Sequence, residues 1–178
     1  MGPNCAGFAN YIDNVYPFAF ISKKRDRKGN VGLISQSGQL CLSLMESEDM
    51  KFSYAISAGN SKIITMEDYI QFLVDDENTK VVSIYLEGVK EPEKFINALR
   101  KAAINRKPVV VLKAGKSAKG KKNAASHTGS LAGSDKTFDA IFKKYGVIRV
   151  DDMEELLATS HMFSVIEKLP EKSTFASM

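Results

Sequence analysis

The sequence predicts a three-layer α/β/α fold of the flavodoxin kind, built on a parallel sheet of five strands. Two observations carry this prediction. Segments typical of strands and of helices alternate five times between Val31 and Ile166. The strand segments are continuous apolar runs, as expected where helices cover both faces of a parallel sheet. With right-handed connections between the strands, we expect the strand order 2-1-3-4-5.

The first two strand–helix units follow a charged stretch that ends at Asn30. Val31–Ser35 is a short apolar run, which predicts a buried strand, and Gly38–Met50 is a leucine-rich segment of helical length. Phe52–Ser57 predicts the second strand. Met66–Asp75 carries its apolar residues at helical spacing and predicts the second helix.

The remaining units repeat the pattern. The third strand and helix are predicted at Val81–Leu86 and Pro92–Asn105, the latter with one apolar face. Pro108–Leu112 is rich in β-branched residues and predicts the fourth strand. After a long gap, the last elements are predicted as follows: a helix at Lys136–Tyr145, a strand at Val147–Val150 and a helix at Met153–Ile166.

Composition excludes several classes of protein. The chain has 178 residues with 44% hydrophobic and 26% charged residues, which suits one ordinary globular domain. No apolar run approaches the roughly 20 residues that cross a bilayer, and no signal segment opens the chain. Cys5 and Cys41 are too few for a disulfide framework. The net charge of +4 is spread out and not interleaved with aromatic residues. We therefore expect a cytoplasmic protein that binds neither membrane nor nucleic acid.

Ligands of such sheets bind at the carboxyl ends of the strands, so the residues that follow each strand are the first candidates. Ser37, Gly38 and Gln39 open a helix directly after the first strand, where free N–H groups and the helix dipole favour an anion. A plain serine cap is the alternative interpretation. Glu87 ends the third strand, where a carboxylate can orient a histidine. A solvated strand end is the alternative there.

The segment between Ala114 and Ser134 is unusual because it is long and almost devoid of large apolar residues. His127 lies in its middle among small residues, which let another molecule approach the imidazole closely. Gly129 is one of these neighbours and a further candidate for phosphate binding. Nearby lysines suit a phosphoryl group: Lys113, Lys116, Lys119, Lys121 and Lys122. We expect this segment to be less ordered than the core.

Other roles for histidine are less well supported. His161 lies in the last predicted helix among apolar residues and is expected to be an ordinary surface or core residue. No second ligand stands at metal-binding spacing from His127, so no metal site is predicted. The motifs of α/β-hydrolases, dinucleotide-binding domains and P-loop NTPases are absent from the sequence.

Taken together, the motifs resemble those of the NDP-forming acyl-CoA synthetases, the superfamily that includes succinyl-CoA synthetase and ADP-forming acetyl-CoA synthetase. The resemblance covers nearly the whole chain and is stronger to the acetyl type. Five segments carry it, with Gly146–Val150 in addition: Gly2–Cys5, Ser35–Gly38, Ser57–Asn60, Tyr85–Gly88 and Ser126–Gly133.

The resemblance implies a phosphohistidine domain. His127 would take the phosphoryl group from an acyl phosphate or a nucleotide, and Glu87 would hold its imidazole. The phosphoryl group would be bound at Ser37 and Gly38. Asn4 and Cys5 match the end of the family's CoA-binding domain and are candidates for contact with that cofactor. The cofactors implied for the complete enzyme are CoA and ATP or ADP with Mg²⁺.

The same resemblance divides the chain into three parts. Residues 1–27 correspond to the end of a CoA-binding domain and a linker, 28–168 to the phosphohistidine domain, and 169–178 to a tail. The expected partners are a CoA-binding domain, an ATP-grasp domain or subunit, and a small acyl substrate. Two other functions stay open: a non-catalytic, regulatory synthetase-like domain of a protein acetyltransferase, in which the histidine is commonly lost, and a flavodoxin-like binding module.

Overall fold

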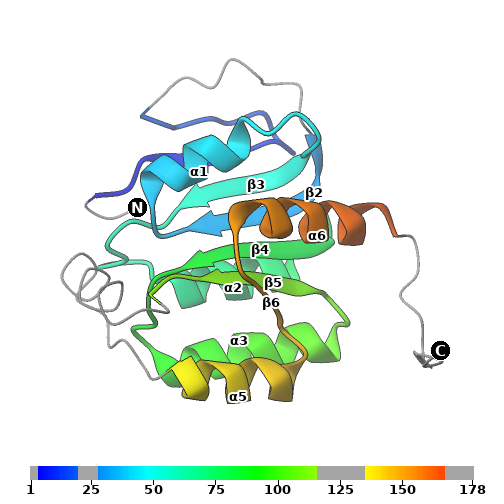
Figure 1. Cartoon of the computed structure of the whole chain (residues 1–178). Helices are drawn as coiled ribbons and strands as arrows, with labels where there is room; N and C mark the ends of the chain where they lie inside the picture. Colours follow the sequence, from blue (N-terminus) through cyan, green and yellow to red (C-terminus); the bar gives the residue numbers. More distant parts are fainter. Residues whose placement is uncertain (1–3, 20–27, 116–134, 167–178) are drawn as a thin grey trace.

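The computed structural model describes residues 4–19, 28–115 and 135–166, and these form one open sheet with helices on both faces (Figure 1). The strands of the sheet are β1 (Gly7–Asn10), β2 (Lys28–Ser35), β3 (Phe52–Ser57), β4 (Val81–Leu86), β5 (Val109–Lys113) and β6 (Ile148–Val150). The helices are α1 (Gly38–Met45), α2 (Met66–Asp75), α3 (Pro92–Ile104), α5 (Asp135–Tyr145) and α6 (Met153–Val165).

The order of the sheet is β1-β3-β2-β4-β5-β6. Strands β2 to β6 pair in parallel throughout, which confirms the predicted order 2-1-3-4-5 and the predicted fold. Helices α1 and α6 cover one face, and α2, α3 and α5 cover the other (Figure 1). No helix within the described ranges has the length and apolar character needed to cross a membrane.

Two apolar clusters, one on each face, explain why the strands are continuous apolar runs. Neighbouring residues of one strand contribute to opposite clusters: Leu33 packs with α1 and α6, whereas Ile34 packs with α2 and α3. Val110 and Val111 of β5 divide in the same way. Each such side chain contributes about 1.5–3 kcal/mol when fully buried. The strand pattern therefore follows from burial on both sides of the sheet.

Apart from shifts of one residue at the ends of other elements, the structure differs from the sequence-based prediction at three places. Strand β1 was not predicted; it adds a sixth, antiparallel strand at the edge beside β3. Strand β2 begins at Lys28, three residues before its predicted start at Val31, and its first residues pair irregularly with β3. Helix α1 ends at Met45, five residues before its predicted end at Met50, and Met50 is buried in the apolar cluster on the α1 and α6 face of the sheet.

Candidate active site

A pocket of about 370 Å³ lies at the carboxyl ends of β2, β3 and β4. The turns that follow these three strands form its walls, together with the segment that precedes β1. The residues that line it are Asn4, Cys5, Ala6, Ala19, Gln36, Ser37, Gly38, Gln39, Leu42, Asn60 and Glu87. The site is therefore built from segments up to about eighty residues apart in the sequence, brought together by the strand order.

The turn from β2 into α1 gives the pocket a helix N-terminus. Ser37 caps the helix: its Oγ accepts a hydrogen bond from the N–H of Leu40 at 3.3 Å, and its carbonyl oxygen accepts from the N–H of Cys41 at 3.0 Å. The N–H groups of Gly38 and Gln39 precede these and have no acceptor within the helix. Since the dipole of α1 adds partial positive charge here, this end of the pocket suits an anion.

The amino-terminal segment of the described chain lies against the same helix start. The N–H of Ala6 donates to Ser57 Oγ at 2.9 Å, and Asn4 Nδ2 donates to Asn60 Oδ1 at 3.1 Å. Gly59 has a φ of +55°, and a Cβ at this position would lie 2.5 Å from the carbonyl oxygen of Asn4. The turn after β3 therefore requires glycine, and this lets the amino-terminal segment pack closely over the pocket.

Glu87 directly follows β4 and lines the same pocket as the start of α1. Its backbone is held by two side chains. Gln36 Oε1 accepts from the N–H of Glu87 at 2.6 Å, and Lys113 Nζ donates to the carbonyl oxygen of Glu87 at 2.9 Å. Burial, and secondly the negative charge of Glu87, raise the pKa of the Tyr85 hydroxyl. The carboxylate thus adds negative charge to a half-buried region of the pocket whose helix start suits an anion.

Sequence reasoning named Gln36 only as part of a motif and gave it no role. In the structure its side chain is 7% exposed and reaches from the end of β2 to the end of β4. A long polar residue directly after a buried strand is the signal that could have drawn attention to it. The direction of its side chain, however, depends on which strand lies next to β2.

Lys113 was expected to supply positive charge for a phosphoryl group. It is 6% exposed, and its ammonium group donates to the carbonyl oxygens of Glu87 and Ala114 and lies over the ring of Phe138. These contacts join the ammonium group of Lys113 to the backbone near the ends of β4 and β5 and to an aromatic ring.

The structure brings together six of the predicted site residues in this one pocket: Asn4, Cys5, Ser37, Gly38, Gln39 and Glu87. The other two, His127 and Gly129, lie outside the described residues. So does most of the segment for which lower order was predicted. Their roles stay predictions.

The remaining candidates for chemistry are less suited. Burial raises the pKa of the Cys41 thiol to about 12, so this cysteine is not a nucleophile near neutral pH. His161 is exposed on α6, far from the pocket residues in sequence and absent from its lining. Among residues 4–19, 28–115 and 135–166, no group of three His, Cys, Asp or Glu side chains could hold a metal ion.

Comparison with known proteins identifies the family of the chain. Residues 28–163 match the family described as the succinyl-CoA ligase-like flavodoxin domain. The chain belongs to the NDP-forming acyl-CoA synthetase superfamily. The membership predicted from the motifs is thereby confirmed.

Curated relatives in this superfamily are longer than the chain. The alpha subunit of the ADP-forming acetate–CoA ligase II of Pyrococcus furiosus is 40% identical over 182 residues, which cover 100% of this chain and 38% of that subunit. The ADP-forming 4-hydroxybutyrate–CoA ligase of Nitrosopumilus maritimus is 37% identical over 168 residues, covering 92% of this chain and 24% of that protein.

A solved structure of the superfamily shares the fold. The dinucleotide-forming acetyl-coenzyme A synthetase 1 of Ca. Korarchaeum cryptofilum, in complex with phosphate and ADP, superposes with a TM-score of 0.86 and 33% sequence identity. The match covers 97% of this chain and 37% of that one. The chain thus spans between 24% and 38% of the length of these three relatives.

Proposed function

We propose that this chain is the phosphohistidine-carrying part of an NDP-forming acyl-CoA synthetase of the acetyl, ADP-forming type. The overall reaction is acyl-CoA + ADP + phosphate ⇌ acid + CoA + ATP. His127 accepts the phosphoryl group and passes it on. The observation that carries the proposal is that the start of α1 and Glu87 line one pocket, because this pocket offers free N–H groups for an anion and a carboxylate for an imidazole.

The chemistry assigned to His127 is a nucleophilic relay. The neutral imidazole attacks the phosphorus of an acyl phosphate; the P–O bond to the acyl group breaks, and the acid leaves as a carboxylate. Attack by an oxygen of the ADP β-phosphate on the same phosphorus then forms ATP and returns the neutral imidazole. Each step moves one phosphoryl group, and no oxidant or reductant takes part.

Four residues that line the pocket have a proposed part in this relay: Ser37, Gly38, Gln39 and Glu87. The N–H groups of Gly38 and Gln39, together with the dipole of α1, bind the oxygens of the transferred group and stabilise the charge they carry in the transition state. Ser37 keeps the helix start in place through its cap on Leu40. The carboxylate of Glu87 accepts a hydrogen bond from the second ring N–H of His127. This bond fixes the tautomer of the imidazole and favours its phosphorylated form.

CoA, nucleotide and Mg²⁺ are expected to bind chiefly to other parts of the polypeptide or to a partner subunit. Asn4 and Cys5 line the pocket, and we propose that they contact the CoA-binding domain. Their close packing over the pocket would bring that domain next to the phosphoryl site. We propose a CoA-binding domain, an ATP-grasp domain or subunit and a small acyl substrate as the partners.

The test is labelling of the full-length protein that contains this chain with Mg-ATP carrying ³²P at the γ-position. We expect a phosphate that is labile to acid and stable to base, bound to His127. His127→Ala should abolish both labelling and turnover. His161→Ala is the matched control and should leave both unchanged, because His161 is exposed on α6. Labelling that persists in His127→Ala would refute the proposal and favour a non-catalytic or binding role for this histidine.

A further inference from the structure

The loop that follows β4 carries Glu87 and is held at both ends by buried polar side chains. We propose that Gln36 is a positioning residue for phosphoryl transfer: its side chain fixes the backbone of Glu87 and Gly88 and thereby the distance between the Glu87 carboxylate and the start of α1. This inference rests on the function proposed above and adds a residue to it.

The contacts of Gln36 use both ends of its amide. Oε1 accepts from the N–H of Glu87 at 2.6 Å and from the N–H of Gly88 at 3.0 Å. Nε2 donates to the carbonyl oxygen of Gly88 at 2.9 Å. One buried side chain therefore forms three hydrogen bonds to two consecutive residues of another strand end, and this leaves the backbone at Glu87 a single orientation.

The need for such a side chain follows from the end of the sheet. The parallel ladder between β2 and β4 runs to the pair Ser35–Tyr85, and the N–H of Gln36 still donates to the carbonyl oxygen of Tyr85 at 3.3 Å. Beyond this pair the two segments diverge: the segment after β2 enters α1, and the segment after β4 runs toward α3. The side-chain amide continues the pairing where the backbone no longer can, because buried N–H groups require acceptors.

Gln36 is also adjacent in sequence to the anion site. Its backbone is followed immediately by Ser37 and Gly38, whereas its side chain holds Glu87. A single residue thus joins the two halves of the pocket. A displacement of the Gln36 amide would change the position of the carboxylate relative to the phosphoryl-binding N–H groups, on which the rate of transfer depends steeply.

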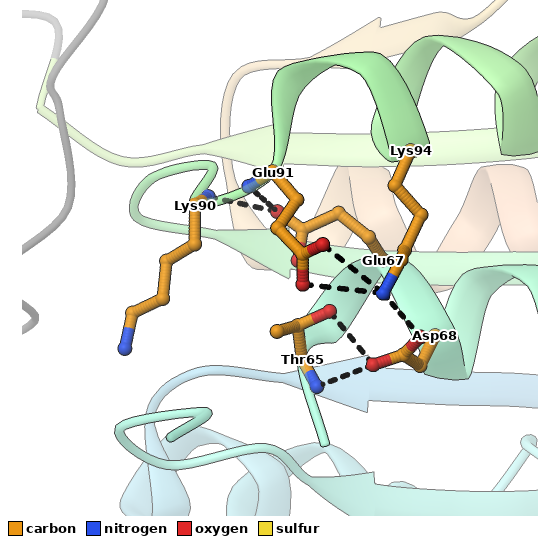
Figure 2. Close-up of polar contacts among 6 residues, drawn as sticks. All are labelled: Thr65, Glu67, Asp68, Lys90, Glu91 and Lys94. Carbon is orange, nitrogen blue, oxygen red and sulfur yellow. Dashed lines mark hydrogen bonds and ion pairs between the residues drawn. The ribbon is translucent and has the colours of Figure 1, made fainter. Parts of the chain in front are cut away.

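The far end of the loop is held by Glu67, as Figure 2 shows. Glu67 is 1% exposed, and its Oε1 accepts from the N–H of Lys90 at 2.8 Å and from that of Glu91 at 3.4 Å. Lys90 Nζ in turn donates to the carbonyl oxygens of Asn60 and Ser61 in the turn before α2. Since this end is fixed to α2, release of the Gln36 contacts loosens the loop next to Glu87 while its other end stays in place. Lys113 Nζ still donates to the carbonyl oxygen of Glu87 in that case.

The experiment measures the single-turnover rate of ³²P transfer from Mg-ATP to His127 in the full-length protein, with substitutions of Gln36. Gln36→Glu has the same length and can still accept from both N–H groups, but its ionised carboxylate cannot donate to the carbonyl oxygen of Gly88. We expect a rate about 10-fold lower at pH 8, since a lost hydrogen bond leaves that oxygen facing a negative charge. The apparent KM for ATP should stay the same.

The pH dependence separates positioning from a merely structural role. A protonated carboxyl group has one donor and one acceptor and so reproduces the glutamine amide. Burial raises the pKa of a carboxyl group here, whereas hydrogen bonds from the two N–H groups lower it. In either case the protonated form, which can donate to the carbonyl oxygen of Gly88, gains population as the pH falls. The ratio of the Gln36→Glu rate to the wild-type rate should therefore rise as the pH is lowered from 8 to about 5.5.

Gln36→Met provides the second variant, and Gln71 provides the control. Gln36→Met removes all three hydrogen bonds, and we expect about a 10²-fold lower rate with a lower Tm. Gln71, partly exposed in α2, receives the same two substitutions, which should leave both rate and pH profile unchanged. Should Gln36→Met not fold, Gln36→Glu alone decides the matter.

The possible outcomes are distinct. A flat ratio of Gln36→Glu to wild type across the pH range, with the rate per folded molecule unchanged, overturns the positioning role and leaves Gln36 as a structural residue. Labelling that survives His127→Ala instead overturns the proposed function itself, whatever the Gln36 variants show.

Discussion

Two hollows of this domain differ in what surrounds them. The pocket at the carboxyl ends of β2, β3 and β4, of about 370 Å³, is bounded by turns, a helix start and a carboxylate. A groove of about 590 Å³ lies between the β1–β3 edge of the sheet and α2, and aromatic side chains form much of it. The aromatic residues of this groove are Phe8, Tyr54, Tyr69 and Phe72. The larger of the two hollows therefore offers fewer groups that could take part in a reaction.

The side chains around the two hollows also have different partners. Around the pocket, the side chains of Gln36 and Lys113 hold the backbone of Glu87, which leaves a defined surface for a ligand. Around the groove, Tyr54 and Phe72 pack edge to face with ring centroids 5.2 Å apart. The comparison teaches that the proposed anion site rests on the N–H donors of a helix start, and not on the size of a hollow.

The largest effect in this comparison is expected from Glu87→Gln. Glutamine has the size of glutamate, so the fold should remain, but it lacks the charge that favours a phosphorylated imidazole. We expect the rate of His127 phosphorylation in the full-length protein to fall about 10²-fold or more. Rapid-quench ³²P labelling measures this rate. Glu77→Gln, at an exposed position after α2, is the control; equal rates in the two variants would contradict the assignment of Glu87.

A smaller effect on labelling is expected from substitutions of Gly38 that narrow the proposed anion site. A Cβ on Gly38 would lie 3.3 Å from Ala6 Cβ and 3.5 Å from Ser57 Oγ, so alanine fits with a small adjustment. Valine adds two methyl groups beside the N–H groups of the helix start. We expect Gly38→Val to lower the labelled fraction about 10-fold and Gly38→Ala to change it about 2-fold at most, on the scale of losing part of an anion-binding contact.

Phosphate release measured over time after removal of ATP gives a second reading of the Gly38 variants. The phosphorylated form of Gly38→Val should decay faster than that of Gly38→Ala. Equal decay in both variants would show that the phosphoryl group is held elsewhere.

A substitution in the aromatic groove should lower the stability of the protein and leave its labelling unchanged. Phe72 is 47% exposed and packs against Tyr54. Phe72→Ala should lower the free energy of unfolding by about 1–2 kcal/mol and the Tm by about 2–6 °C. The labelling rate per folded molecule should not change. Thermal denaturation and labelling of the same preparation test both statements, and a loss of labelling comparable to that of Glu87→Gln would assign the groove a part in the reaction.

The smallest effect concerns Asp68 at the rim of the groove, and it depends on pH. Burial acts to raise the pKa of Asp68, but hydrogen bonds from Lys94 and then from Thr65 outweigh it and lower that pKa (Figure 2). The stabilisation is therefore present above the unfolded-state pKa of about 3.9 and is lost as the pH falls through the lower folded-state value.

For this reason Asp68→Asn should lower the Tm by about 1–3 °C at pH 7, as expected for a pair that is about a third exposed. The difference between variant and wild type should shrink below about pH 4. Calorimetric scans at pH 7 and pH 3 measure it. A difference that grows toward low pH would mean that Asp68 is protonated in the folded protein.

Much of the fold could be predicted because each parallel strand lies buried between two helical layers and so reads as one apolar run. Val109–Lys113 is buried throughout, and such a segment is recognisable without any knowledge of its neighbours. Strand β1 was missed for the converse reason. It has only four residues, and what makes it a strand is its pairing with Ser57 to Tyr54, about fifty residues away.

For the site, the sequence by itself determined which residues could carry the chemistry. Glu87 follows a buried strand directly, and Ser37 and Gly38 follow one within three residues. Position after a strand is a local property of the chain. Only the tertiary structure decided how these residues are held. Gln36 acts on Glu87 because β4, and not β3, lies on that side of β2. A side-chain amide bonds whatever backbone lies beside it, and strand adjacency is fixed by the packing of the whole sheet and by no single segment of sequence.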